Sequence, residues 1–216
     1  MEQNHNPAKG QIDDNSIKVL EWNEHIQRRP EMYIGQLGDG SDPKDGIYTL
    51  LKGVLVMAMD EFQMGFGKGF SVEVKNDYAV VRDYGRGIPL ESVVSATSGI
   101  SVGMGANPKG ATIHPVKVTN ALSIDFYVAS FRDGECSWAK YSKGNLLEKG
   151  IEKTAEDNGT YIKFVPDPEV FADYAFREGI VKEILHSIAR QNKGLSISLN
   201  GTIVPDSFRV PQSKTH

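Results

Sequence analysis

The sequence has only one cysteine, Cys136, among its 216 residues. A single cysteine can form neither an internal disulfide nor a zinc site with several cysteine ligands, so we expect it to be a small, partly buried apolar residue. The sequence also lacks an apolar run long enough to cross a bilayer. Its polar start, MEQNHNPAKGQIDDNS, lacks the charged and apolar regions of a signal peptide. These absences favour the reducing environment of the cytoplasm.

Neither sign of charge dominates the chain. It has 24 basic and 28 acidic residues and a formal net charge of -4, so its overall field repels phosphates. We therefore expect no direct DNA binding from this chain alone. Hydrophobic residues make up 39% of the chain, which is typical of a globular protein, and the length permits a sizeable core.

The start of the chain differs in composition from the remainder. Residues 1–15 are polar and contain Pro7 and Gly10, which predicts a flexible N-terminal arm. We expect residues 16–216 to form a single domain. Its apolar spacing predicts helices from Ser16 to before Pro30, over residues 47–64, in the short run VKVTNAL (116–122) and over residues 174–191.

Alternating and β-branched residues predict strands between these helices. Residues 70–76 and 78–84 indicate a hairpin that turns near Asn76 and Asp77, and residues 124–134 and 136–144 indicate a second hairpin. A further strand is expected at 159–167, and a strand with a turn at 195–205. Residues 92–113 are rich in glycine and predict a long connection. This order of elements predicts an α/β sandwich of two layers.

The run DYGRGIP, residues 83–89, places a carboxylate at the end of a predicted strand, next to glycines that let the backbone approach a ligand. This run alone is a weak signal. It is accompanied by SIKVL (16–20), RRPEMYIG (28–35), MDE (59–61), TNALS (119–123) and GTYIKFVPD (159–167). In order and spacing these blocks resemble the N-terminal ATPase domain of type IIA DNA topoisomerase B subunits, those of DNA gyrase and topoisomerase IV.

The resemblance covers about Ser16 to Pro205 and implies the fold of the GHKL superfamily of ATPases. That fold is a two-layer α/β sandwich in which helices cover a mixed, mostly antiparallel sheet. The resemblance also implies ATP as the ligand and magnesium as its metal.

Residue by residue, the resemblance implies that Asp83 accepts the adenine amino group and that Thr160 holds a neighbouring water. Arg86 closes over the base and pairs with Glu61. The implied binding set is Asp83, Gly85, Arg86, Gly87, Ile88, Pro89, Thr160 and Glu61, with Val54, Val81 and Ile162 as apolar walls. Structural alternatives exist: Asp83 starts a turn, the ion pair is a surface pair worth under about 1 kcal/mol, and the valines belong to the core.

The pattern breaks at two positions on the helix that carries MDE. Family members have a glutamate that activates water and, one helical turn later, an asparagine that binds magnesium. Alignment on MDE places Gly53 and Met57 there, and both share a helix face with Glu61 because the three are four residues apart. Glycine cannot accept a proton, and a thioether is a poor ligand for a hard cation. We therefore expect no catalytic residue, no magnesium, and ATP hydrolysis that is absent or very slow.

A second break lies in the glycine-rich run around a histidine that holds phosphates in the family. His114 is present, but Pro115 has no N–H to donate, and side chains replace the surrounding glycines. Lys109 and Lys117 either supply charge to phosphates or lie on a solvated surface. His114 is expected to be structural.

Three functions remain open on this interpretation. The first is a non-hydrolysing homologue that acts through protein contacts, because family domains dimerise by exchanging N-terminal arms. The exchange implies a homodimer or a heterodimer with a topoisomerase B subunit. The second is an ATP-binding domain of an active, ATP-hydrolysing topoisomerase. The third is a sensor whose adenine corner, made more apolar by Met57, accepts a nucleoside or another flat ligand.

Overall fold

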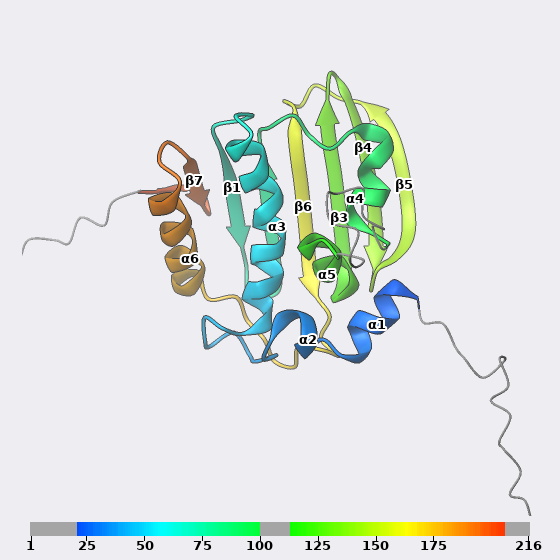
Figure 1. Ribbon diagram of the computed structural model, residues 1–216, viewed down its shortest axis with the longest axis vertical. Coiled ribbons are helices and arrows are strands. Elements are labelled where there is room, and N and C mark those ends of the chain that lie inside the picture. The colour runs from blue at the N-terminus through cyan, green and yellow to red at the C-terminus, as the bar shows by residue number, and fades with distance from the viewer. Residues whose placement is uncertain (1–20, 100–112, 206–216) are drawn as a thin grey trace, which may run out of the picture.

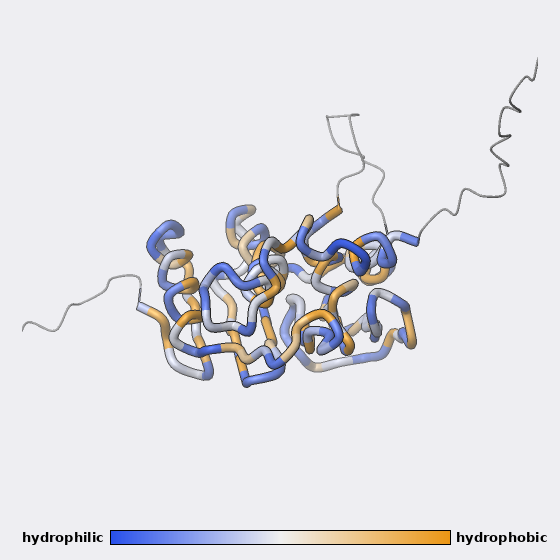
Figure 2. Tube along the Cα trace, turned by 90° about the horizontal axis from the view of Figure 1, so that it is seen from below, coloured by the Kyte–Doolittle hydropathy of each residue, from blue (hydrophilic) through white to orange (hydrophobic). Residues whose placement is uncertain are grey.

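The computed structural model describes residues 21–99 and 113–205, which form an eight-stranded sheet with helices packed on one face (Figures 1 and 2). The helices are α1 (Trp22–Arg28), α2 (Glu31–Ile34), α3 (Gly46–Gln63), the 3-10 turn η2 (Leu90–Ser92), α4 (Val93–Thr97), α5 (Pro115–Ala121) and α6 (Glu178–Gln191). The strands are β1 (Gly69–Val74), β2 (Ala79–Asp83), β3 (Ser123–Arg132), β4 (Glu135–Ser142), β5 (Asn145–Lys153), β6 (Gly159–Pro166), β7 (Ser196–Leu199) and β8 (Thr202–Val204).

The strand order is β5-β4-β3-β6-β2-β1-β7-β8. Of the neighbouring pairs, β1 and β7 run parallel and the others run antiparallel. The predicted two-layer α/β sandwich with a mixed, mostly antiparallel sheet is therefore confirmed. Strand β2 ends and strand β6 begins beside the loop 84–89, so these two central strands bring Asp83 and Thr160 together.

The first predicted hairpin shows why these residues form strands. Phe70, Val72 and Val74 alternate along β1 and are buried, whereas the residues between them face away from the helices. The chain turns at residues 76–77, as predicted, and the Lys75 amide donates to the Tyr78 carbonyl at 3.0 Å. Every residue of β2 is buried, because this strand lies in the middle of the sheet.

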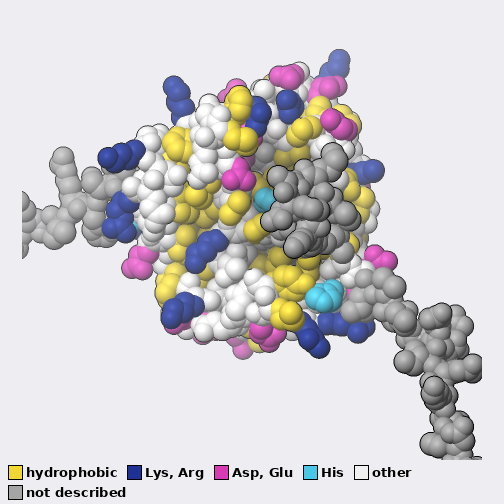
Figure 3. Space-filling view, in the orientation of Figure 1, with side chains coloured by type: hydrophobic (Ala, Val, Ile, Leu, Met, Phe, Trp, Pro, Cys, Tyr) yellow, Lys and Arg dark blue, Asp and Glu magenta, His cyan; other side chains and the backbone are white. Residues whose placement is uncertain are grey.

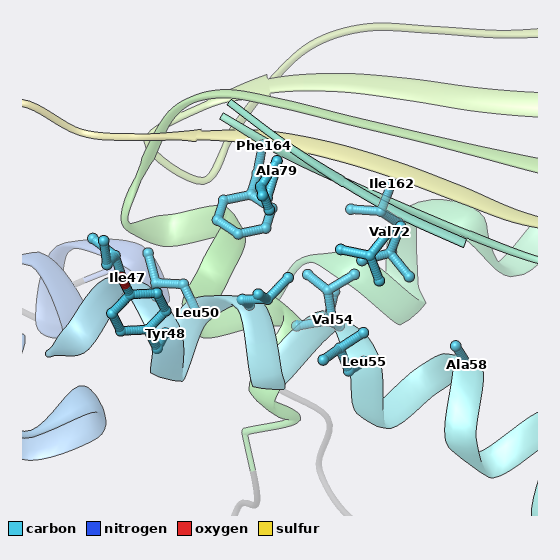
Figure 4. Packing of buried hydrophobic residues seen from close by; sticks show 14 of the residues in the cluster. Ile47, Tyr48, Leu50, Val54, Leu55, Ala58, Val72, Ala79, Ile162 and Phe164 are labelled. Atoms are coloured by element: carbon cyan, nitrogen blue, oxygen red, sulfur yellow. The ribbon is translucent and has the colours of Figure 1, made fainter. Parts of the chain in front are cut away.

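Helix α3 forms much of the core between the layers. Its apolar residues recur at helical spacing and are buried, and Figure 4 shows Val54 pointing toward Val72 and Ile162 of the sheet. Burial of a side chain of this size stabilises the fold by about 1.5–3 kcal/mol. This packing fixes the orientation of α3 about its own axis. It therefore also determines which side chains in the C-terminal half of α3 face the sheet.

The first helix differs from its prediction. Glu21 has extended backbone angles, φ -61° and ψ 153°, so a continuous helix from Ser16 through Ile26 is wrong, and α1 begins at Trp22. The apolar spacing of residues 17–26 does not extend α1 across this extended residue. The arm predicted at residues 1–15, and the block SIKVL, lie outside the described residues.

Three other predictions also need correction. Part of the predicted long connection is helical, because Val93–Thr97 forms α4; residues 100–112 lie outside the described part. The last helix begins at Glu178 rather than at Tyr174, since the amides of Ala175 and Phe176 bond to Asp39 and Asn76 instead. Strand β5 is an element that the sequence pattern does not predict, and the closing segment contains two strands, β7 and β8, rather than one.

Among the described residues, no helix is both long enough and apolar enough to span a bilayer.

Candidate functional site

A cavity of about 390 Å³ opens on the helix-bearing face, beside the C-terminal half of α3. Figure 3 views this face and shows hydrophobic side chains exposed among the helices. The cavity is lined by Met57, Asp60, Glu61, Met64, Arg86, Gly87, Ile88, Pro89, Ala96, His114, Arg132 and Thr160. Six of these, Glu61, Arg86, Gly87, Ile88, Pro89 and Thr160, belong to the binding set predicted from the sequence.

Asp83 forms a buried polar corner at the end of β2. Its side chain is 4% exposed, and its Oδ1 accepts a hydrogen bond from the Gly85 amide at 2.9 Å. Burial raises the pKa of Asp83 above its ordinary value, although hydrogen bonds from Gly85 and from the amide and hydroxyl of Thr160 favour the carboxylate. The corner therefore combines a carboxylate acceptor with a threonine hydroxyl, which suits the recognition of a ligand amino group.

Arg86 is held over the cavity by Glu61. Its amide and Nε donate to Glu61 Oε2 at 2.8 and 3.2 Å, and its Nη2 donates to Oε1 at 2.9 Å. Burial pushes the pKa of Glu61 upward, but the bonds and charge of Arg86 outweigh burial and hold this pKa below its ordinary value. The predicted pairing of Arg86 with Glu61 is confirmed.

The loop after α3 adds two contacts to this ion pair. The Phe66 ring lies 3.7 Å from the centre of the Arg86 guanidinium, and Met64 Sδ lies 3.6 Å from Nη2. Glycine is required at 85, because a Cβ there would come within 2.7 Å of Glu61 Oε2. The guanidinium is thus fixed as a wall of the cavity rather than left free at the surface.

The predicted apolar walls lie deeper than expected. Val54, Val81 and Ile162 are 1–3% exposed and belong to the core beneath the cavity, and none of them is among the described residues that line it. Ile88 and Met57 supply apolar lining instead. A role of the three core residues in holding a ligand stays a prediction.

Gly53 and Met57 occupy different surroundings on α3. A Cβ at Gly53 would lie 3.0 Å from both the Pro115 carbonyl and Thr119 Oγ1, so α5 packs directly against this position. Met57 lines the cavity. Neither side chain offers oxygen or nitrogen, and the next carboxylate along this lining is Asp60, since Glu61 is engaged by Arg86.

His114 caps α5 at the rim of the cavity. Its Nδ1 accepts a 3.4 Å hydrogen bond from the Val116 amide, and Pro115 occupies the first turn. Burial lowers the pKa of His114 below 6.5, an effect that Asp60 opposes and Lys117 reinforces. The structural role predicted for His114 agrees with this geometry.

Lys117 differs from its prediction, whereas Lys109 lies outside the described residues. The Lys117 side chain is 2% exposed, so its interpretation as a solvated surface lysine is wrong. Lys117 lies in α5, where residues 116–121 are all buried and the helix packs against α3 and the sheet.

Sequence reasoning missed Asp60, Met64, Ala96 and Arg132 as lining residues. Asp60 and Met64 follow Met57 at intervals of three and four, so the helical period of α3 was a usable signal. Arg132 gave no such signal, because only the pairing of β3 with β6 brings it to the cavity. Within residues 21–99 and 113–205, there is no group of three or more His, Cys, Asp or Glu that could hold a metal ion.

The sequence of the chain is similar to those of known topoisomerase B subunits. The chain is 41% identical over 197 residues to the DNA topoisomerase 4 B subunit of Borreliella burgdorferi, and the match covers 88% of this chain and 33% of that protein. It is 32% identical over 209 residues to the DNA gyrase B subunit of Enterococcus faecalis, covering 88% and 31%. The Mycolicibacterium smegmatis gyrase B subunit is 35% identical over 211 residues, covering 90% and 30%. The chain thus spans about a third of the length of these relatives.

A solved structure shows the same fold. The 43K ATPase domain of Thermus thermophilus gyrase B, in complex with an aminocoumarin, superposes with a TM-score of 0.68 at 27% identity. The match covers 84% of this chain and 50% of that one. No protein-family model matches the chain.

Proposed function

The chain is homologous to the B subunits of DNA gyrase and topoisomerase IV and has the fold of a gyrase B ATPase domain, and we propose that it has lost magnesium-dependent ATP hydrolysis and acts by binding. What it binds is a flat, adenine-like ligand in the α3 cavity, a protein partner, or both. Residues 16–216 form the one domain that does so in this proposal, with residues 1–15 as its arm.

One observation supports the loss of hydrolysis more than any other. The helix face that should carry a general base and a magnesium ligand carries Gly53 and Met57, and α5 packs against Gly53. Removal of a positioned general base typically lowers a rate by a factor of about 100 to 10,000. Loss of the metal weakens charge stabilisation on the phosphates as well.

The polar corner supports a remaining binding function. Thr160 lines the cavity, and the buried Asp83 beside it accepts hydrogen bonds from the Thr160 amide and hydroxyl. Arg86 forms a fixed planar wall of the same cavity. A flat heterocycle with an exocyclic amino group satisfies the corner and stacks on the guanidinium. Met57 makes the floor apolar, so binding in this proposal depends on the base rather than on a metal-bound triphosphate.

Calorimetry with adenosine and with a non-hydrolysable ATP analogue tests this proposal, with and without magnesium. We expect binding that a chelator does not change, and no phosphate release from ATP. Asp83→Asn keeps the shape of the corner but replaces an acceptor oxygen with a donor, so it should weaken adenosine binding at least about tenfold, consistent with one charge-assisted hydrogen bond. Lys140→Gln, a surface change far from the cavity, serves as the matched control. Submicromolar binding that requires magnesium, or robust phosphate release, would refute the proposal.

The second candidate function is an active ATPase, and Asp60 is the residue that favours it. Among the carboxylates that line the cavity, Asp60 is the nearest along α3 to Gly53 and Met57. If the chain hydrolyses ATP with Asp60 as a base or metal ligand, Asp60→Asn must abolish the activity. Under our proposal the unaltered chain and this variant are equally inactive.

The protein-contact part of the proposal concerns the N-terminal arm. The relatives are topoisomerase B subunits, and arm exchange pairs this chain either with itself or with such a subunit. Native mass spectrometry of the chain, alone and mixed with a gyrase B subunit, measures both. We expect a dimer in at least one sample, and monomers throughout would contradict this part of the proposal.

A further inference from the structure

Strand β5 forms an unusually exposed edge of the sheet. It is nine residues long, pairs only with β4 among the described strands, and is exposed along nearly its whole length. Leu147 and Ile151 are 67% and 64% exposed. A long edge strand with unpaired backbone groups and apolar side chains is a template for another strand, and proteins usually cover such an edge.

Helix α1 brings the chain to the start of this edge. Asn23 Nδ2 donates to the Lys143 carbonyl at 2.9 Å and to Asn145 Oδ1 at 3.1 Å, and Gln27 Nε2 donates to the same carbonyl at 2.7 Å. The Trp22 ring lies against Gly144, where a Cβ would come within 3.1 Å of it. Figure 1 shows α1 beside the end of the sheet where β5 begins.

The residue before α1 is extended, since Glu21 has β-region backbone angles. Residues 16–20 immediately precede it and read SIKVL, which alternates apolar Ile17 and Val19 with Lys18. A segment that runs toward Asn145 beside a strand that runs away from Asn145 is antiparallel to that strand.

The two faces of β5 match this alternation. On the helix side, Ile151 and Lys149 border a cavity of about 280 Å³ that is also lined by Leu90, Val94 and Glu91. On the opposite face, Glu148 pairs with Lys140 of β4, and Glu152 lies opposite Cys136. A strand that places Ile17 and Val19 toward the apolar residues of this cavity places Lys18 toward the two carboxylates of the opposite face.

We propose that residues 16–20 of the same chain lie along β5 as an added antiparallel strand. The segment is joined directly to α1, so this pairing closes a short loop and needs no second molecule. Pairing of β5 with a second copy of itself is less favourable. A two-fold arrangement centred on Lys149 places two lysines opposite each other, and one centred on Gly150 places Glu148 opposite Glu152, which destabilises the pair.

Hydrogen–deuterium exchange on the full chain tests this inference. We expect the β5 amides that do not bond to β4 to be protected, and Val19→Pro to increase their exchange at least about tenfold, because proline removes a donor and disfavours strand pairing. Gln11→Pro, outside the segment, is the matched control and should change nothing. Lys18→Glu should increase exchange by a smaller factor.

Each alternative gives a distinct result. Unprotected outer amides of β5 in the unaltered chain would overturn the inference, and so would protection that survives Val19→Pro. Protection that falls on dilution, together with a dimer in native mass spectrometry, would assign the covering strand to a second copy and overturn the same-chain pairing. Exchange in the β1–β2 hairpin monitors global unfolding, and if Val19→Pro unfolds the chain, the result with Lys18→Glu decides.

Discussion

At the scale of single residues, Arg86 shows how a surface cation becomes part of a site. Glu61 bonds to it through both oxygens, and Phe66 covers one face of the guanidinium. An isolated surface ion pair contributes little, but a guanidinium held on several sides loses its mobility before a ligand arrives. The same contacts hold Arg86 in place as one wall of the cavity.

The sequence predicts part of this site correctly for a physical reason. Asp83, Arg86 and Glu61 lie in short, recognisable runs, so their proximity follows from the motif. Arg132 and Ala96 lie in segments whose sequences carry no signal, and they reach the cavity only through the strand pairing and the packing of α4. Val54, Val81 and Ile162 lie in the predicted region, but they lie beneath the cavity instead of in its lining. An apolar residue near a pocket has the same sequence pattern whether it lines the pocket or packs behind the lining.

His114 leads to a prediction about acid stability. Its pKa is lowered from 6.5 by burial, so the unfolded chain binds more protons than the folded chain as pH falls through this range. The stability due to neutral His114 is therefore present above about pH 6.5 and is lost as pH falls toward its native pKa. Urea unfolding between pH 8 and pH 5 should show this loss. His114→Asn retains an N-cap acceptor but cannot titrate there, so its loss over the same window should be smaller. An unchanged pH dependence in this variant would exclude His114 as the source.

At the scale of elements, the predictions succeed where the apolar period is strong. Helix α3 and strand β1 match within a few residues because each buries an apolar face that recurs at the period of the element. Strand β2 matches because it is a short, fully buried run between turn residues. Strand β5 escapes prediction because an edge strand has no buried face, and NLLEKGIEK therefore shows no alternation. The predicted start of α6 is too early because Tyr174 and Phe176 are apolar but are held in an irregular segment by tertiary contacts.

The contact between α3 and α5 predicts that a larger side chain at position 53 destabilises the fold. At Gly53, the Pro115 carbonyl and Thr119 Oγ1 lie 3.0 Å from the position that a Cβ would take, closer than ordinary contact. We therefore expect Gly53→Ala to lower the free energy of unfolding even though alanine favours helices. At Gly179 of α6 nothing lies within 4 Å of the same position, so Gly179→Ala should raise stability by up to about 1 kcal/mol.

The double variant Gly53→Glu with Met57→Asn extends this test to activity. Its glutamate must displace α5 to reach the cavity, so we expect no restored phosphate release and a lower urea midpoint than in the unaltered chain. Magnesium-dependent ATP hydrolysis by the double variant, absent from the unaltered chain, would show that α5 moves easily and that the proposed loss of activity resides in these two side chains alone.

Helix α6 gives a stability prediction of known size. Leu185 is fully buried between this helix and the sheet, whereas Glu183 is exposed. Leu185→Ala should lower the free energy of unfolding by about 2–5 kcal/mol, since it removes buried methyl groups and leaves a cavity. Glu183→Ala should change it by less than about 0.5 kcal/mol. Equal effects in urea unfolding would mean that α6 does not pack in this position in solution.

At the scale of the whole molecule, the charge balance predicts weak DNA binding by this chain, although its relatives are topoisomerase subunits. A net charge of -4 gives the chain no general attraction for phosphates. Two arginines, Arg86 and Arg132, line the cavity, and Arg86 is already paired with Glu61. Affinity for duplex DNA comes largely from counterion release by clustered lysines and arginines and falls steeply with salt.

Fluorescence anisotropy with a labelled duplex should therefore show at most weak binding at low salt and none at physiological salt. The full-length relatives are about three times longer, so a positive control with a complete gyrase B subunit shows whether DNA contacts depend on the remaining two thirds. Tight binding by this chain at physiological salt would require a local basic surface strong enough to outweigh its net charge, and would contradict the argument from composition.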